Sequence, residues 1–165
     1  MPDKLPKQRG YIITPDGYIA IGNRQSQLGN YPSALAAYER AVKIAPNYAR
    51  AYNYRGSFKY ARLGNVGGAF ADFDSAIGCD PDYAIAYANR GLLRYQQLGD
   101  IPGALADLNL AILLDPRDAS TYNTRGLIKY ELKDIEYALA DYDLAITSGR
   151  LRQRDRPYLC SCLQL

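Results

Sequence analysis

Three arginines recur along the chain at steps of 35 residues, and each is accompanied by a second cation four residues later and by an aspartate sixteen or seventeen residues later. The arginines are Arg55, Arg90 and Arg125, and the aspartates are Asp72, Asp107 and Asp141. A planar guanidinium can bind a carboxylate through two parallel hydrogen bonds. The recurring set therefore indicates either structural ion pairs between two segments of the chain or a ladder of cations for an acidic ligand.

The chain contains one further copy of the surrounding pattern that lacks the charged set altogether. In this first copy the three positions are occupied by Ile21, Gln25 and Ala37. Pairing each arginine with the aspartate of the preceding copy would leave Arg55 facing Ala37, and it would leave Asp141 without a partner. The distribution of the residues therefore favours ion pairs within each copy, although a cationic ladder stays open as the alternative.

The residue types on which most catalytic sites depend are scarce. The chain has no histidine, which removes the commonest general base, the commonest metal ligand and every Ser-His or Cys-His nucleophile. Cys79 stands where other copies have Ile44 and Leu114, so we expect a small buried hydrophobe. Cys160 and Cys162 do not by themselves complete a tetrahedral zinc site. We therefore expect no catalytic residues, no metal site and no cofactor, and we interpret the chain as a protein that is not an enzyme.

Comparison of the sequence with itself shows four copies of one sequence pattern. The stretch LGNVGGAFADFDSAIGCDP, from Leu63 to Pro81, is followed by LGDIPGALADLNLAILLDP, from Leu98 to Pro116. The copies are expected at about 14–47, 48–82, 83–117 and 118–148. A flexible basic arm (1–13) precedes them, and a basic and apolar tail (149–165) follows them. A period of 34 or 35 residues is typical of stacked repeats.

Each copy has the pattern of two helices. Apolar residues recur at helical spacings, a Gly with Asp or Asn interrupts them in the first three copies, and a proline ends the same three copies. Two short helices cannot bury an apolar face alone, so the pairs must stack. We expect the recurrent glycines to allow close approach of the two helices, with larger residues facing them. The glycines are Gly22, Gly56, Gly91 and Gly126, and the larger residues are Tyr38, Phe73, Leu108 and Tyr142.

These residues resemble the tetratricopeptide repeat family. The shared features are an aromatic residue, a glycine four residues later, the pattern Ala-x3-aromatic-x2-Ala, and a proline five residues after that. The resemblance implies an all-α fold, a right-handed superhelical solenoid of four helix pairs, whose first helices line a concave groove that binds a peptide or a partner protein. The repeat sequences also resemble a variant of the family that is common in cyanobacterial and plastid proteins, some of which assist photosystem assembly. This resemblance suggests an assembly factor as one role.

A helical projection places one stripe of each first helix on the expected groove. Its residues are Asn23, Arg50, Asn53, Ser57, Tyr60, Ile85, Asn89, Leu92, Tyr95, Ser120, Asn123, Leu127 and Tyr130. Tyrosine and asparagine suit an extended peptide, because they provide apolar area together with hydrogen bonds to a backbone. The alternative is that the tyrosines pack mainly against neighbouring helices.

The groove residues do not match one specialised form of the family. Members that bind chaperone C-termini hold a carboxylate with lysine, arginine and asparagine side chains. At the matching positions this chain has Ile19, Asn23, Tyr54, Ile85 and Asn89. Only Asn23 agrees, so a carboxylate-clamp co-chaperone is not expected.

Composition and charge set the remaining expectations. With 48% hydrophobic and 22% charged residues, the chain has the composition of a globular protein. No secretory signal or membrane span is apparent and the cysteine count is odd, so we expect a cytoplasmic location. The net charge is +3 and gathers at the two ends, which leaves no basic face for nucleic acid. The expected partner is a protein or peptide. The alternative function is self-association into a homo-oligomer through uncapped repeat ends.

Overall fold

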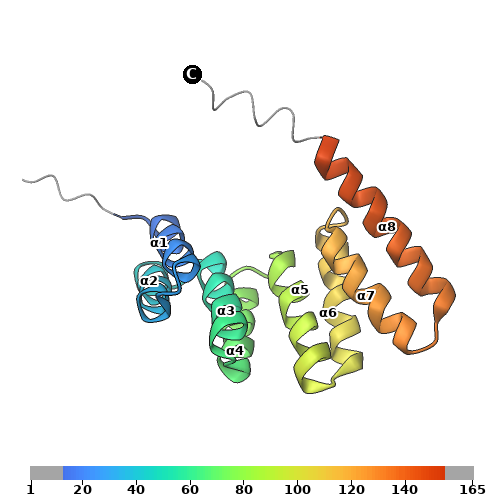
Figure 1. Cartoon of the computed structure of the whole chain (residues 1–165), viewed down its shortest axis with the longest axis horizontal. Helices are drawn as coiled ribbons and strands as arrows, with labels where there is room; N and C mark the ends of the chain where they lie inside the picture. The colour runs from blue at the N-terminus through green and yellow to red at the C-terminus, as the bar shows by residue number, and fades with distance from the viewer. Residues whose placement is uncertain (1–12, 155–165) are drawn as a thin grey trace, which may run out of the picture.

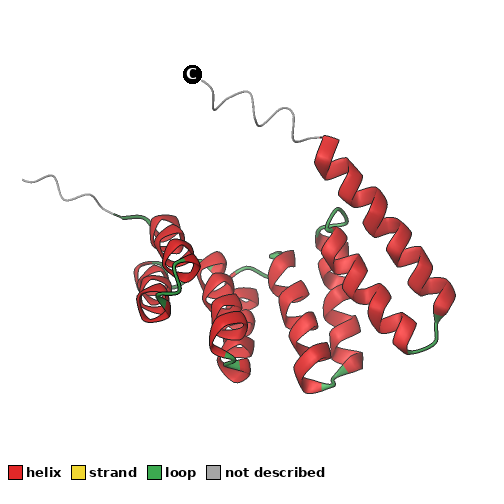
Figure 2. Cartoon of the chain, viewed as in Figure 1, coloured by secondary structure: helices red, strands yellow, loops and turns green. Residues whose placement is uncertain are grey.

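The computed structural model describes residues 13–154, and every regular element in that range is a helix (Figure 2). The helices form four consecutive pairs, one for each copy of the sequence pattern, so the predicted all-α solenoid is confirmed. The pairs are α1 (Pro15–Gln27) with α2 (Tyr31–Ile44), α3 (Ala49–Leu63) with α4 (Val66–Cys79), α5 (Ala84–Leu93) and its π-helical continuation η1 (Arg94–Leu98) with α6 (Ile101–Leu114), and α7 (Ala119–Glu131) with α8 (Ile135–Arg154).

The last helix is longer than the sequence suggested. The expected repeat ended at residue 148, but α8 continues to Arg154, so the first residues of the expected tail extend the helix. Pro46, Pro81 and Pro116 follow the three earlier second helices, but α8 has Arg150 at the equivalent place, and an arginine does not stop a helix. The rest of the tail (155–165) and nearly all of the N-terminal arm (1–12) lie outside the described residues.

Short polar side chains start several of the helices. Thr14, Asn65, Asp100 and Asp118 each precede a helix, and each accepts a hydrogen bond from the backbone N–H three residues later. These bonds satisfy donors that have no partner inside the helix. The sequence therefore determines where the helices begin through caps as well as through the apolar period.

The turn inside each pair has one recurrent backbone conformation. Gly29, Gly64 and Gly99 have φ values of 75°, 63° and 63°, and Lys133 occupies the same place in the fourth pair with φ 67°. This left-handed region suits glycine because it has no Cβ. The fourth turn thus keeps its geometry with a residue that is strained there.

Close approach within each pair depends on the recurrent glycines. A Cβ added to Gly22, Gly56, Gly91 or Gly126 would lie 2.6, 2.9, 3.1 or 2.9 Å from the facing side chain. The facing side chains are the expected ones, namely Tyr38, Phe73, Leu108 and Tyr142. The two helices of a pair can therefore pack this closely only because these positions of the first helix carry no side chain.

The core is a series of clusters that join adjacent pairs. Phe58, Leu93 and Ile128 stand at equivalent positions of α3, α5 and α7, and their exposed fractions are 4%, 0% and 0%. Each packs against the preceding pair, on Tyr38, Phe73 and Leu108 respectively. The pairs consequently follow one another along the molecule (Figure 1). The predicted groove residues lie on α1, α3, α5, η1 and α7. In the described part of the chain no helix is both long and apolar enough to cross a membrane.

The cysteine at the end of α4 is less buried than the sequence suggested. Cys79 is half-buried at the edge of the cluster formed by Ala49, Ala76 and Ala86. Its thiol lies 3.5 Å from the carbonyl oxygen of Pro46. The residue therefore packs as a small hydrophobe, but at the rim of the core, because the helix ends there.

Candidate partner-binding groove

Each recurring arginine binds the aspartate of its own helix pair. Arg90 donates from Nε and Nη2 to the two carboxylate oxygens of Asp107, at 2.9 and 2.6 Å. The same two-bond geometry joins Arg55 to Asp72, at 3.0 and 2.6 Å, and Arg125 to Asp141, at 2.9 and 2.5 Å. The contacts confirm the pairing within each copy that the sequence predicted.

The second cation of each set contacts the same carboxylate. Lys59, Arg94 and Lys129 lie 2.8, 3.1 and 3.0 Å from Asp72, Asp107 and Asp141. The aspartates are 3%, 2% and 2% exposed. Burial raises the pKa of the Asp141 carboxyl, but hydrogen bonds from Arg125 and Lys129 outweigh burial and hold its pKa below the ordinary value. The carboxylate therefore stays ionised inside the fold, held by two cations.

The arginines also connect each pair to the one before it. Arg90 Nη1 donates to Asp74 of α4 at 2.6 Å, and Arg125 Nη1 donates to Asn109 of α6 at 2.7 Å. Glu39 of α2 is the residue equivalent to Asp74 and Asn109. The hydrogen bond to Asp72 raises the pKa of Arg55 most, and the negative charge of Glu39 raises it further. Helix periodicity did not reveal this second link, because its acceptor changes between Glu, Asp and Asn.

A tyrosine ring lies beside each of the three recurring arginines. The guanidinium carbons of Arg55, Arg90 and Arg125 lie 5.5 to 5.7 Å from the ring centroids of Tyr52, Tyr87 and Tyr122, within the range of a cation–π interaction. The arginine side chains are only 16–18% exposed. Their donors are directed into the protein, and this geometry favours a structural role over a ladder for an acidic ligand.

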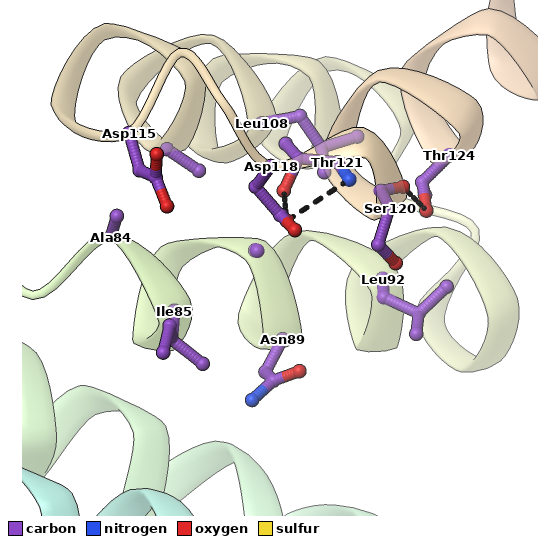
Figure 3. Close-up of a pocket in the computed structure, with 12 residues that line it drawn as sticks. Ala84, Ile85, Asn89, Leu92, Leu108, Asp115, Asp118, Ser120, Thr121 and Thr124 are labelled. Atoms are coloured by element: carbon purple, nitrogen blue, oxygen red, sulfur yellow. Dashed lines mark hydrogen bonds between the residues drawn. The ribbon is translucent and has the colours of Figure 1, made fainter. Parts of the chain in front are cut away.

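Four predicted groove residues line one cavity. Ile85, Asn89 and Leu92 of α5 and Ser120 of α7 surround a space of about 270 Å³ (Figure 3). The other lining residues are Ala84, Ala88, Leu108, Ala111, Asp115, Asp118, Thr121 and Thr124. Asp115 and Asp118 were not predicted because they precede α7, outside the helical stripe. The cavity lies at the junction of the third and fourth pairs.

Several other predicted groove residues hold adjacent first helices together. Tyr60 donates its hydroxyl to Gln96 at 2.8 Å, and Tyr95 donates to Glu131 at 2.6 Å. The hydrogen bond to Glu131 and burial raise the pKa of Tyr95 to about 12. These contacts support the alternative that the tyrosines pack against neighbouring helices. Tyr130 differs, because its side chain is 53% exposed.

Three of the predicted asparagines also form hydrogen bonds with other side chains of the protein. Asn53 is 5% exposed and accepts a hydrogen bond from Asn89 at 2.8 Å; Asn89 also lies 3.5 Å from Ser57. Asn23 accepts a hydrogen bond from Tyr38 at 2.7 Å.

Near the first pair, Arg50 forms an ion pair with Asp16 at 3.1 Å. In contrast, Asn123 and Leu127 of α7 are exposed. The accessible part of the predicted groove is thus concentrated on α5 and α7.

Helix pairs that stack in one direction and share core clusters define an α-solenoid of helix–turn–helix repeats. Residues 19–84 match the family model described as tetratricopeptide repeat, so this part of the chain is similar to that family. The comparison with curated proteins gives no match.

Solved structures share the architecture at low sequence identity. The crystal structure of MamA has a TM-score of 0.70 at 20% identity, covering 86% of this chain and 82% of its own. A thermophilic tetratricopeptide repeat protein of Thermus thermophilus has a TM-score of 0.69 at 25% identity, covering 81% and 74%. The first such domain of Spaghetti (RPAP3), bound to the HSP90 peptide SRMEEVD, has a TM-score of 0.65 at 24% identity, covering 73% and 94%.

Proposed function

We propose that the chain is a non-enzymatic scaffold that holds an extended peptide or a segment of a partner protein against α5 and α7. The observation that carries the proposal is the cavity between these helices, because four of the predicted groove residues line it. The peptide-bound domain of Spaghetti (RPAP3) supports the class of ligand. A scaffold of this kind can serve as an assembly factor when a second protein binds elsewhere on the solenoid.

The binding function can be tested with purified protein and defined peptides. A random library of displayed 12-residue peptides is selected on the full chain, and the enriched peptides are measured by fluorescence anisotropy. Leu127 is 42% exposed on α7 and does not line the cavity. Leu127→Glu should weaken the enriched peptides about tenfold, because it places a charge in an apolar contact.

The matched control is Leu113→Glu on α6, which is 76% exposed and lies outside the predicted groove. It should bind the peptides like the parent chain. Failure to enrich any peptide, or equal loss in both variants, would remove the groove as the binding surface.

Self-association is a second candidate, and the exposed end of the fourth pair favours it. Leu35, Phe70 and Leu105 are half-buried, but the equivalent Leu139 on α8 is 59% exposed. Val42, Ile77 and Ile112 are half-buried as well, but the equivalent Ile146 is 54% exposed. The last pair therefore presents the surface that every earlier pair uses to bind its successor.

The first pair of a second copy is suited to cover this end. Tyr60 and Tyr95 bind Gln96 and Glu131 in the following pair. In α1, the first helix of the chain, the residue equivalent to Gln96 and Glu131 is Gln27. In α7 the residue equivalent to Tyr60 and Tyr95 is Tyr130, and Tyr130 is exposed. A head-to-tail contact would continue the stacking already present inside the chain, and such contacts form open chains of subunits.

Multi-angle light scattering over a range of concentrations tests this second candidate. The measured mass should rise with concentration for the parent chain, and Ile146→Glu should abolish the rise while Leu113→Glu should not. A monomer mass that does not change with concentration contradicts self-association and leaves the peptide-binding proposal untouched.

A further inference from the structure

One stripe of the last helix is apolar and exposed. Ile135, Leu139 and Ile146 follow one another along α8 at helical spacings, so they lie on one face, which we call the α8 stripe. Their exposed fractions are 43%, 59% and 54%. Among the described residues no helix follows α8, so the stripe stays uncovered in this part of the chain.

The counterparts of the stripe show which side chains bind such a face. Ile101 and Leu105 of α6 pack on a buried cluster that contains Ile128 of the next pair. Phe70 of α4 packs on a cluster that contains Leu93 of the next pair. The covering residue is an uncharged aliphatic side chain in both cases. The α8 stripe is therefore suited to aliphatic side chains from a segment that brings no charge with it.

The sequence that follows α8 has a composition that fits this face. Residues 158–165 read YLCSCLQL and contain no charged side chain. In an extended chain, alternate residues point to the same side, and this places three leucines together, namely Leu159, Leu163 and Leu165. The N-terminal arm (1–12) is less suited, because it has three cationic side chains and joins the solenoid at α1, at the opposite end from α8 (Figure 1).

We propose that residues 158–165 pack in an extended conformation along the α8 stripe and compete there with a second copy of the chain. The leucines face α8, and the residues between them face the solvent. The packing goes beyond both proposed functions, and only the competition rests on the proposed self-association. By covering the stripe, the tail limits the head-to-tail contact to high concentrations of the protein.

The segment is long enough to reach the stripe. An α-helix rises about 1.5 Å per residue, so Arg154 at the end of α8 lies about 12 Å along the helix from Ile146 and about 22 Å from Leu139. Eight extended residues span about 26 Å. Pro157 stands between α8 and these residues, and a proline ends a helix, so it favours the change of direction that the packing requires.

A single tryptophan can report the packing, because the chain has no tryptophan of its own. Leu163→Trp places the ring on the side that faces α8, and Gln164→Trp places it on the opposite side. Fluorescence is recorded on the full chain at a concentration at which light scattering gives the monomer mass. We expect Leu163→Trp to emit at a shorter wavelength than Gln164→Trp, because its ring is removed from water. Thermal unfolding by circular dichroism verifies that each variant is folded.

A second substitution, on α8, tests whether the stripe is the surface that covers the ring. In the Leu163→Trp chain, Ile146→Glu should move the emission to a longer wavelength, because it places a charge on the stripe. Leu113→Glu is the matched control, because Leu113 is exposed on α6 and lies outside the stripe, and it should leave the emission unchanged. Equal emission from Leu163→Trp and Gln164→Trp, or no response to Ile146→Glu, overturns the packing.

Light scattering tests the competition separately. The triple variant Leu159→Ser, Leu163→Ser, Leu165→Ser keeps the length of the chain but removes the aliphatic groups. A tail that covers the stripe in about nine-tenths of the molecules leaves about one-tenth able to bind, so the triple variant should show the same rise in mass at about tenfold lower concentration. An unchanged concentration dependence overturns the competition. A monomer mass at every concentration in both chains contradicts self-association and the competition with it, whereas the fluorescence result still decides the packing.

Discussion

Removing the carboxylate of Asp107 alone should destabilise the protein far more than removing it together with both of its cations. Asp107 is 2% exposed and receives hydrogen bonds from Arg90 at 2.9 and 2.6 Å and an ion pair from Arg94 at 3.1 Å. Breaking a buried pair by removing one partner costs about 3–5 kcal/mol, because the other charge stays desolvated. Arg90 retains its contacts with Asp74 and Tyr87, so we expect about 3 kcal/mol for Asp107→Ala.

The first pair of the solenoid supplies the matched neutral replacement. The triple variant Arg90→Ile, Arg94→Gln, Asp107→Ala copies the residues found at Ile21, Gln25 and Ala37. Because it leaves no buried charge, it should cost about 1 kcal/mol, even though it removes more interactions. Asp74 would lose Arg90, but its side chain is 46% exposed and can be hydrated.

Urea unfolding followed by helical circular dichroism measures both variants. Their slopes must equal that of the parent chain before the free energies are compared, because repeats in a solenoid can unfold separately. If the triple variant is as unstable as Asp107→Ala, the ion pair stabilises the fold outright, and the argument from an uncompensated charge is refuted.

Three further predictions concern backbone strain, packing and pH. Lys133→Gly should raise the free energy of unfolding by about 0.5–1 kcal/mol, measured by urea unfolding, because φ 67° is strained for lysine; a lower stability would contradict this. Gly91→Ala should lower it by about 1–3 kcal/mol, since the new Cβ would lie 3.1 Å from Leu108 and 3.2 Å from a carbonyl oxygen; an unchanged unfolding midpoint would show that the helices can separate freely. The folded-state pKa of Asp141 lies below its unfolded value, so its stabilising contribution is complete above about pH 4 and is lost as the pH falls through the folded pKa. The stability difference between the parent chain and Asp141→Asn should therefore shrink from about pH 6 to about pH 3, and a constant difference would exclude the linkage.

The fold and the ion pairs could be predicted because they depend on residues that recur. Arg55 and Asp72 appear together, and both are replaced together in the first copy, so their pairing is visible without coordinates. The link from Arg90 to Asp74 could not be predicted in this way, because the equivalent acceptor is a carboxylate in one copy and an amide in another.

The groove was predicted only as a direction on each helix. A helical projection gives the side of α3 on which Tyr60 lies, but it cannot show that the next repeat provides Gln96 as a partner for its hydroxyl. Contacts between repeats decide which residues of the stripe stay accessible. Asp118, which lines the cavity, was missed for a different reason: it belongs to the loop before α7, and a helical projection does not include that loop.

Recurrence itself separates the residues that build this solenoid from those that can give it specificity. A residue that recurs, such as Gly91 or Arg90, has counterparts in other copies and makes contacts inside the protein. A side chain that departs from its counterparts can do so because the stacking does not require it. Ala88 and Asp118 are such departures, since the equivalent residues one repeat earlier are Asn53 and Tyr83, and both line the cavity. Partner selection in this chain should therefore depend on the positions where the repeat is broken, and substitutions there should change binding with little change in stability.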